Sequence, residues 1–112
     1  MPTHAELAGK LLADAAGFFK TLAEQNPEIQ QEMTENATVF EQMATLITQQ
    51  PEGEANGQAH KDLAGRLLKD AATFFRTLGE QNEPLKEQME ENANIYDQIA
   101  DLLMQNPLGV LE

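Results

Sequence analysis

The chain has no cysteine, no tryptophan and few basic residues, and each shortage excludes a class of function. Without cysteine there is no disulfide, no thiolate nucleophile and no zinc-finger site. Seven Lys+Arg stand against 19 Asp+Glu in 112 residues, a net charge of -12, which argues against binding nucleic acid or anionic membrane surfaces. No apolar run approaches the roughly 20 residues of a membrane span, and the N-terminus lacks a secretory pattern. We therefore expect a cytoplasmic protein without a cofactor.

What the sequence does contain is a tandem repeat with a period of 56 residues. Asp14-Ala-Ala-Gly-Phe-Phe becomes Asp70-Ala-Ala-Thr-Phe-Phe, and 26 of the 50 pairs from His4/His60 to Gly53/Gly109 are identical. Two copies are too few for an extended solenoid, so they must bury each other. We predict one domain over residues 1–112. Its parts are repeat 1 (3–50), a linker (51–58), repeat 2 (59–106) and a tail (107–112).

Each copy has the apolar spacing of two amphipathic helices. The first helix places apolar residues at Leu7, Leu11, Ala15, Phe18 and Leu22, and the second places seam residues at Ile29, Met33, Asn36, Phe40, Met43 and Ile47. The broad apolar arc suits a helix with neighbours on two sides. The pattern predicts an all-α fold, a tandem duplication of a helical hairpin forming an antiparallel four-helix bundle. In architecture, each half resembles small helical hairpins that dimerise into bundles.

Capping and turn residues predict where the helices begin and end. Thr3 and Glu6 have the spacing of a capping box, whereas the third helix would start from Asn56 or Gln58. Asn26 is expected to cap a second helix that opens at Pro27. Gly79 is expected to end the third helix in a left-handed cap. We expect Gly9, Gly17 and Gly65 to allow close helix approach, and we expect no strands.

The two histidines and the acidic stripe are the candidate ligands for a metal ion. His4 and His60 lack the carboxylate three or four residues earlier that a di-metal bundle uses, so a helix-end histidine at the mouth of the bundle is favoured over a metal ligand. Glu28, Glu32 and Glu35 share one side of the second helix. Their counterparts are Pro84, Gln88 and Glu91, so a solvated acidic face is favoured over a cation site.

Asn36 and Asn92 occupy seam positions at which an apolar residue would be more stabilising. A buried amide can set the register of packed helices, and the two side chains would then meet near the bundle centre. The alternative is that each reaches the rim or bonds a nearby carbonyl. The sequence leaves both open.

The paired phenylalanines have two interpretations. Adjacent helical residues point about 100° apart, so one ring would fill the core of a hairpin and the other the interface between hairpins. This is the favoured interpretation. In the alternative, Leu12 with Phe19 and Leu68 with Phe75 stay exposed as a docking patch.

Three function hypotheses follow. The leading one is a non-catalytic interaction or scaffold protein that binds a protein partner, basic in character, through an acidic helical face. We expect a monomeric bundle, with further self-association as the alternative. The second is a bundle that binds a metal or small ligand through His4, His60 and facing carboxylates. The third is an acidic decoy of a nucleic-acid-binding protein. We expect no enzyme activity, because the chain has no cysteine, only scattered threonine hydroxyls and no glycine-rich phosphate-binding loop.

Overall fold

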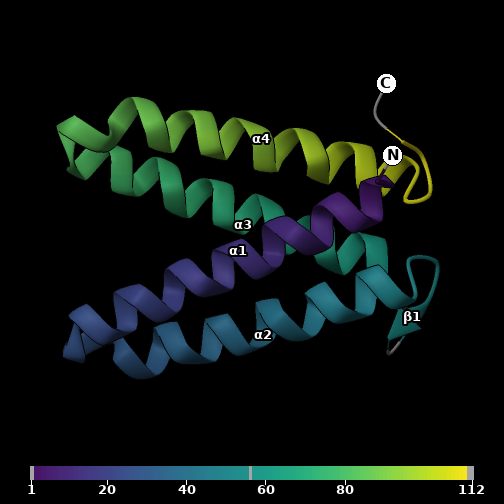
Figure 1. Ribbon diagram of the computed structural model, residues 1–112, viewed down its shortest axis with the longest axis horizontal. Helices are drawn as coiled ribbons and strands as arrows, with labels where there is room; N and C mark the ends of the chain where they lie inside the picture. The colour runs from purple at the N-terminus through teal and green to yellow at the C-terminus, as the bar shows by residue number, and fades with distance from the viewer. Residues whose placement is uncertain (1, 56, 111–112) are drawn as a thin grey trace.

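The chain folds into two helical hairpins (Figure 1). The computed structural model describes residues 2–55 and 57–110. Four α-helices lie within these residues: α1 (His4–Gln25), α2 (Gln30–Gln49), α3 (His60–Gln81) and α4 (Lys86–Gln105). The predicted all-α fold is confirmed, with α1 packed along α2 and α3 packed along α4.

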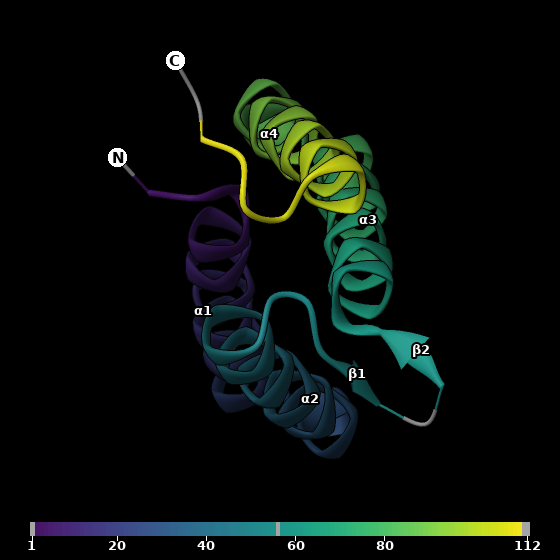
Figure 2. The ribbon, with the colours of Figure 1, turned by 90° about the vertical axis from the view of Figure 1, so that its right-hand side faces the viewer.

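The hairpins cross each other and diverge toward their turns. Helix α1 contacts both α3 and α4, and α2 contacts α3 (Figures 1 and 2). The start of α1, the end of α4 and the segment that links α2 to α3 lie at the opposite end from the two hairpin turns (Figure 1). The crossing places α1 and α3 at the centre of the molecule and leaves α2 and α4 outside them.

The start of α1 matches its prediction, but the start of α3 does not. The Thr3 hydroxyl accepts a hydrogen bond from the Glu6 amide, and the Glu6 carboxylate accepts one from the Thr3 amide, which is the predicted capping box. Helix α3 instead begins at His60, with Ala59 at the cap and no side-chain hydrogen bond there. Gln58 belongs to a strand, and Asn56 lies outside the described residues.

Each hairpin turn contains a short 3-10 helix that the sequence did not predict. These turns span Pro27–Ile29 and Glu83–Leu85, and they precede α2 and α4. Asn26 does not cap α2, because the 3-10 helix separates the two and Ile29 occupies the cap position of α2; the Asn26 side-chain amide donates back to the Leu22 carbonyl instead. The prediction that the second helix begins at Pro27 is therefore wrong, because the α-helix begins one 3-10 turn later.

The glycines within the helices differ in whether a neighbouring helix packs closely against them. Gly79 lies inside α3, so the predicted left-handed cap is wrong; a Cβ there would lie 3.1 Å from Met89 Cβ and 3.2 Å from Lys86 Cα. At Gly9 a Cβ would lie 3.2 Å from the Ala44 carbonyl oxygen, and at Gly65 it would meet the Met104 side chain. Gly17 has nothing within 4 Å, so close approach does not explain it.

The linker and the tail are more ordered than the sequence suggested. Strands β1 (Glu54–Ala55) and β2 (Gln58–Ala59) pair antiparallel, contrary to the expectation of no strands. The segment 107–110 also packs back on the molecule, where Val110 forms a β-bridge with Thr3. The linker between α2 and α3 forms one junction between the hairpins, and the segment after α4 that packs beside the start of α1 forms the other. The two junctions have equivalent hydrogen bonds, because the His60 amide donates to Gly53 O (2.8 Å) and the His4 amide donates to Gly109 O (2.7 Å).

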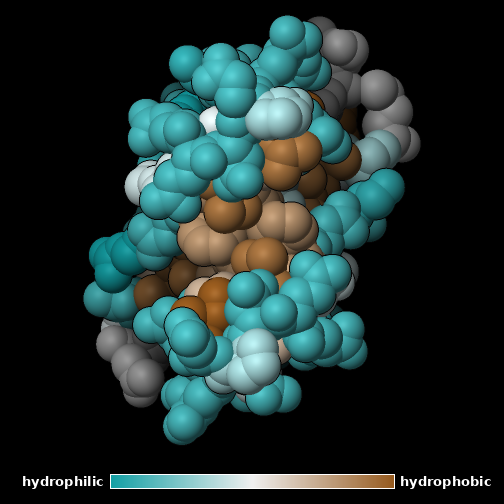
Figure 3. Space-filling view, turned by 90° about the vertical axis from the view of Figure 1, so that its left-hand side faces the viewer, coloured by the Kyte–Doolittle hydropathy of each residue, from teal (hydrophilic) through white to brown (hydrophobic). Residues whose placement is uncertain are grey.

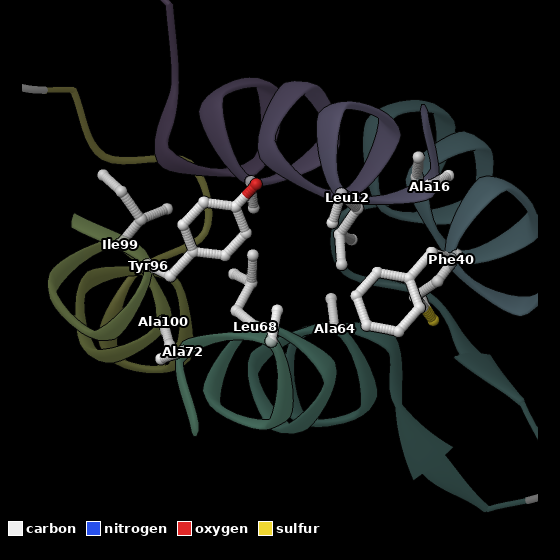
Figure 4. Packing of buried hydrophobic residues seen from close by; sticks show 14 of the residues in the cluster. Leu12, Ala16, Phe40, Ala64, Leu68, Ala72, Tyr96, Ile99 and Ala100 are labelled. Carbon is white, nitrogen blue, oxygen red and sulfur yellow. The ribbon is translucent and has the colours of Figure 1, made fainter. Parts of the chain in front are cut away.

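Leucines and alanines fill the layer between the hairpins. Leu12 and Leu68 are fully buried and point into this layer from α1 and α3 (Figure 4). Many of the other buried positions are alanines, including Ala8 and Ala64. Small side chains let the helix backbones approach each other closely, which dispersion forces favour. The copies therefore bury each other, as predicted.

Candidate functional site

The candidate ligands His4 and His60 are buried at the two junctions between hairpins. His4 Nδ1 lies 2.8 Å from Asn106 O and His60 Nδ1 lies 2.8 Å from Gln50 O, so each ring hydrogen-bonds the carbonyl at the end of a neighbouring helix. This is the favoured helix-end interpretation. Among residues 2–55 and 57–110, no group of three or more His, Cys, Asp and Glu residues is arranged to hold a metal ion.

The residues of the alternative docking patch are core residues. Leu12 and Leu68 are 0% exposed, and Phe19 and Phe75 are 3% and 4% exposed. None of these four side chains presents a surface to a partner. The exposed-patch interpretation is wrong for them, because the hairpins bury the stripes on which they lie.

The phenylalanine pairs supply both interfaces, but the rings are not divided cleanly between them, because Phe19 also packs across the hairpins against Phe74, with ring centroids 5.3 Å apart. Phe19 packs against Phe40 within the first hairpin, with ring centroids 5.1 Å apart. Phe18 packs across the hairpins against Phe74 and Phe75, at 6.2 and 5.5 Å. Phe18 and Phe74 are only half-buried, and so they form part of the surface.

Asn36 and Asn92 do not meet at the bundle centre. Each is half-buried, and each lies in a different groove of the molecule. The described residues include no hydrogen-bond partner for either side chain. The register interpretation is wrong because α2 and α4 lie outside α1 and α3, on opposite hairpins.

Two grooves run between the hairpins, one between α1 and α4 and one between α2 and α3. Their volumes are about 330 and 270 Å³. The α1–α4 groove is lined by Leu11, Asp14, Phe18, Asn92, Ile95 and Tyr96. The equivalents 56 residues away, Leu67, Asp70, Phe74, Asn36, Val39 and Phe40, line the α2–α3 groove. The repeat therefore produces two copies of one surface feature.

The grooves combine an apolar wall with a carboxylate. Val39 and Ile95 occupy equivalent positions and are each 48% exposed. Figure 3, seen from the end that carries the hairpin turns, shows apolar side chains gathered between hydrophilic margins. Sequence reasoning missed these grooves, although the adjacency of Phe18 and Phe19 already required one ring to point away from its own hairpin.

Tyr96 distinguishes the two grooves chemically. Its hydroxyl donates a 2.8 Å hydrogen bond to the Leu11 carbonyl oxygen across the α1–α4 interface. The equivalent Phe40 has no hydroxyl to make such a bond. Burial raises the pKa of the Tyr96 phenol far above its ordinary value, and the nearby Asp14 carboxylate raises it further.

The predicted acidic stripe forms a hollow beside the α2–α3 groove. Glu28, Glu32 and Glu35 are exposed and, with Gln31 and Asn36, line a hollow of about 450 Å³. Asn36 also lines the groove, so the acidic hollow and the apolar groove share an edge.

The ion pairs of the described chain lie elsewhere. Three join the two helices of a hairpin: Lys20–Glu41 (2.6 Å), Lys69–Asp101 (2.9 Å) and Arg76–Asp97 (2.7 Å). None of the three involves the stripe carboxylates or the groove residues Asp14 and Asp70. These carboxylates are therefore available to cations from outside the chain.

None of the described helices is long and apolar enough to cross a membrane. Comparison of the chain with protein-family models, with curated proteins and with solved structures gave no match. The functional proposal therefore rests on the geometry and charge of the site.

Proposed function

We propose that the protein is a non-catalytic interaction module that binds a basic partner protein through the acidic face of α2. The observation that carries this proposal is the shared edge at Asn36, which joins the hollow of Glu28, Glu32 and Glu35 to the α2–α3 groove. A partner lying across this edge meets carboxylates on one side and apolar side chains on the other.

Charge and apolar contact contribute differently to such binding. An exposed ion pair is worth roughly 0.2–1 kcal/mol and is weakened by salt, so the stripe alone gives weak binding and a fast encounter. The groove adds burial of apolar area, worth about 25 cal/mol per Å². Binding that requires both surfaces selects a partner with lysines or arginines beside an apolar stripe. The metal-binding and decoy alternatives stay predictions, since no observation among residues 2–55 and 57–110 favours either.

Neutralising the stripe is expected to weaken binding of a basic probe. The probe is a synthetic peptide with leucines along one helical face and lysines along the other, titrated at low salt by calorimetry. In the triple variant Glu28→Gln, Glu32→Gln, Glu35→Gln we expect roughly tenfold weaker binding at the acidic face of α2, because three modest ion pairs are lost there.

The control removes the same charge from the other end of the molecule. It combines Glu52→Gln, Glu54→Gln and Asp62→Asn, three exposed carboxylates near the linker. We expect the control to bind the peptide within about twofold of the unmodified protein. Equal weakening in both triples, or no binding by the unmodified protein, would contradict the proposal.

A further inference from the structure

We infer that the chain has two binding sites for amphipathic helices, one in the α1–α4 groove and one in the α2–α3 groove. This rests on the proposed function and extends it, because it states how many partner segments bind and in what conformation. The supporting observation is that seven of the nine residues lining the α1–α4 groove have their equivalents, 56 residues away, in the lining of the α2–α3 groove.

The walls of each groove favour a helical ligand. Both walls are helices, whose backbone N–H and C=O groups already bond within the helix away from its ends. An extended peptide in the groove would bury its own backbone groups without partners, whereas a helix satisfies them internally. Along the α1–α4 groove the lining runs from Leu11 to Phe18 on one wall, about two helical turns or roughly 11 Å. A ligand helix of two to three turns matches this length.

Charge indicates that the ligand helix is basic on its flanks. Asp14 lines one groove and Asp70 the other, and neither belongs to an ion pair among the described residues. The aliphatic and phenylalanine side chains that line each groove can pack against an apolar stripe on the ligand helix. Each aspartate can pair with a lysine or arginine at the margin of that stripe. A ligand helix with acidic flanks would meet like charge at every such point.

The two sites differ in their dependence on salt. The α2–α3 groove adjoins Glu28 and Glu32, whereas the equivalent residues beside the α1–α4 groove are Pro84 and Gln88. The α1–α4 groove offers the larger Ile95 in place of Val39. We therefore expect the α2–α3 site to weaken more steeply as salt rises, while the α1–α4 site depends more on apolar contact.

A matched pair of substitutions separates the sites. Val39→Lys places a cation in the α2–α3 groove and Ile95→Lys places one in the α1–α4 groove. Both positions are 48% exposed, so the change leaves the core intact. Calorimetry with the leucine–lysine peptide measures the number bound, and NMR shifts of backbone amides locate the site. Far-ultraviolet circular dichroism and the unfolding midpoint check that each variant is folded.

The expected result is two peptides bound to the unmodified protein, one to each single variant, and at least a tenfold loss of affinity in the double variant. A single peptide that is lost in Val39→Lys and kept in Ile95→Lys would overturn the two-site inference but leave the proposed function standing. The inference is also overturned if the double variant binds two peptides with the affinity of the unmodified protein. No binding to the unmodified protein at low salt would overturn both proposals.

Discussion

Truncating Leu12 to alanine is expected to lower the free energy of unfolding by about 2–5 kcal/mol, because the change removes buried methyl groups and leaves a cavity. Leu12 is 0% exposed and points from α1 into the layer between the hairpins (Figure 4). The loss is a large share of the roughly 5–15 kcal/mol available to a typical domain. Urea unfolding followed by circular dichroism measures it.

Because the chain is a repeat, a second substitution can test the packing between the two hairpins. Leu68 is also 0% exposed and is the equivalent of Leu12, so Leu68→Ala is expected to cost a similar amount. Val39→Ala, at a position that is 48% exposed, should change stability by less than about 0.5 kcal/mol. If Leu12→Ala costs no more than Val39→Ala, the two hairpins are not packed through this layer.

Raising the pH above about 10 is expected to destabilise the protein through Tyr96. Burial and then Asp14 raise the pKa of the folded phenol above its ordinary value, while the unfolded phenol ionises at the ordinary value. The contribution of the neutral phenol is therefore fully present below pH 10, and it is lost as pH rises from there toward the folded pKa. The decline approaches at most about 1.4 kcal/mol per pH unit.

This effect has a direct spectroscopic readout. The chain has one tyrosine and no tryptophan, so near-ultraviolet phenolate absorbance reports Tyr96 alone. We expect that absorbance to appear together with loss of helical circular dichroism, at a pH above the ordinary titration. Tyr96→Phe loses the hydrogen bond to Leu11 O, about 1 kcal/mol at neutral pH, and shows a shallower alkaline decline. Ionisation at the ordinary pKa with the helices intact would contradict the assignment.

Local sequence signals determined the elements but not their relative placement. The apolar spacing around Leu7 and Met33 predicted helices, and Thr3 with Glu6 predicted a cap that the structure contains. These features depend on residues within one or two turns of each other. The error at Gly79 arose because a glycine that ends a helix and one that admits a neighbouring helix are identical in sequence.

The grooves could not be predicted because they depend on how the hairpins cross. The sequence placed Asn36 and Asn92 on helix seams, and the crossing then placed them in separate grooves. The acidic stripe was visible at Glu28, Glu32 and Glu35, but its edge with an apolar groove was not. Contacts between residues far apart in the chain, such as Tyr96 with Leu11, decide such placements.

The two halves of the chain are equivalent hairpins that bury each other, and they are connected through equivalent junctions. Glu54 pairs with Ala59 at one junction, and Val110 pairs with Thr3 at the other. Four residues separate Glu54 from Ala59. Joining Glu112 to Met1 would also place four residues between Val110 and Thr3, because 112 residues are two periods of 56.

A circular permutant tests this claim most directly. It begins at Gly57, ends at Asn56 and joins Glu112 directly to Met1, and its urea unfolding and mass in solution are compared with those of the original chain. We expect the permutant to be a monomer with the same helical circular dichroism and a free energy of unfolding within about 1 kcal/mol of the original. An unfolded permutant, or one that reaches its helical content only as a dimer, would contradict it.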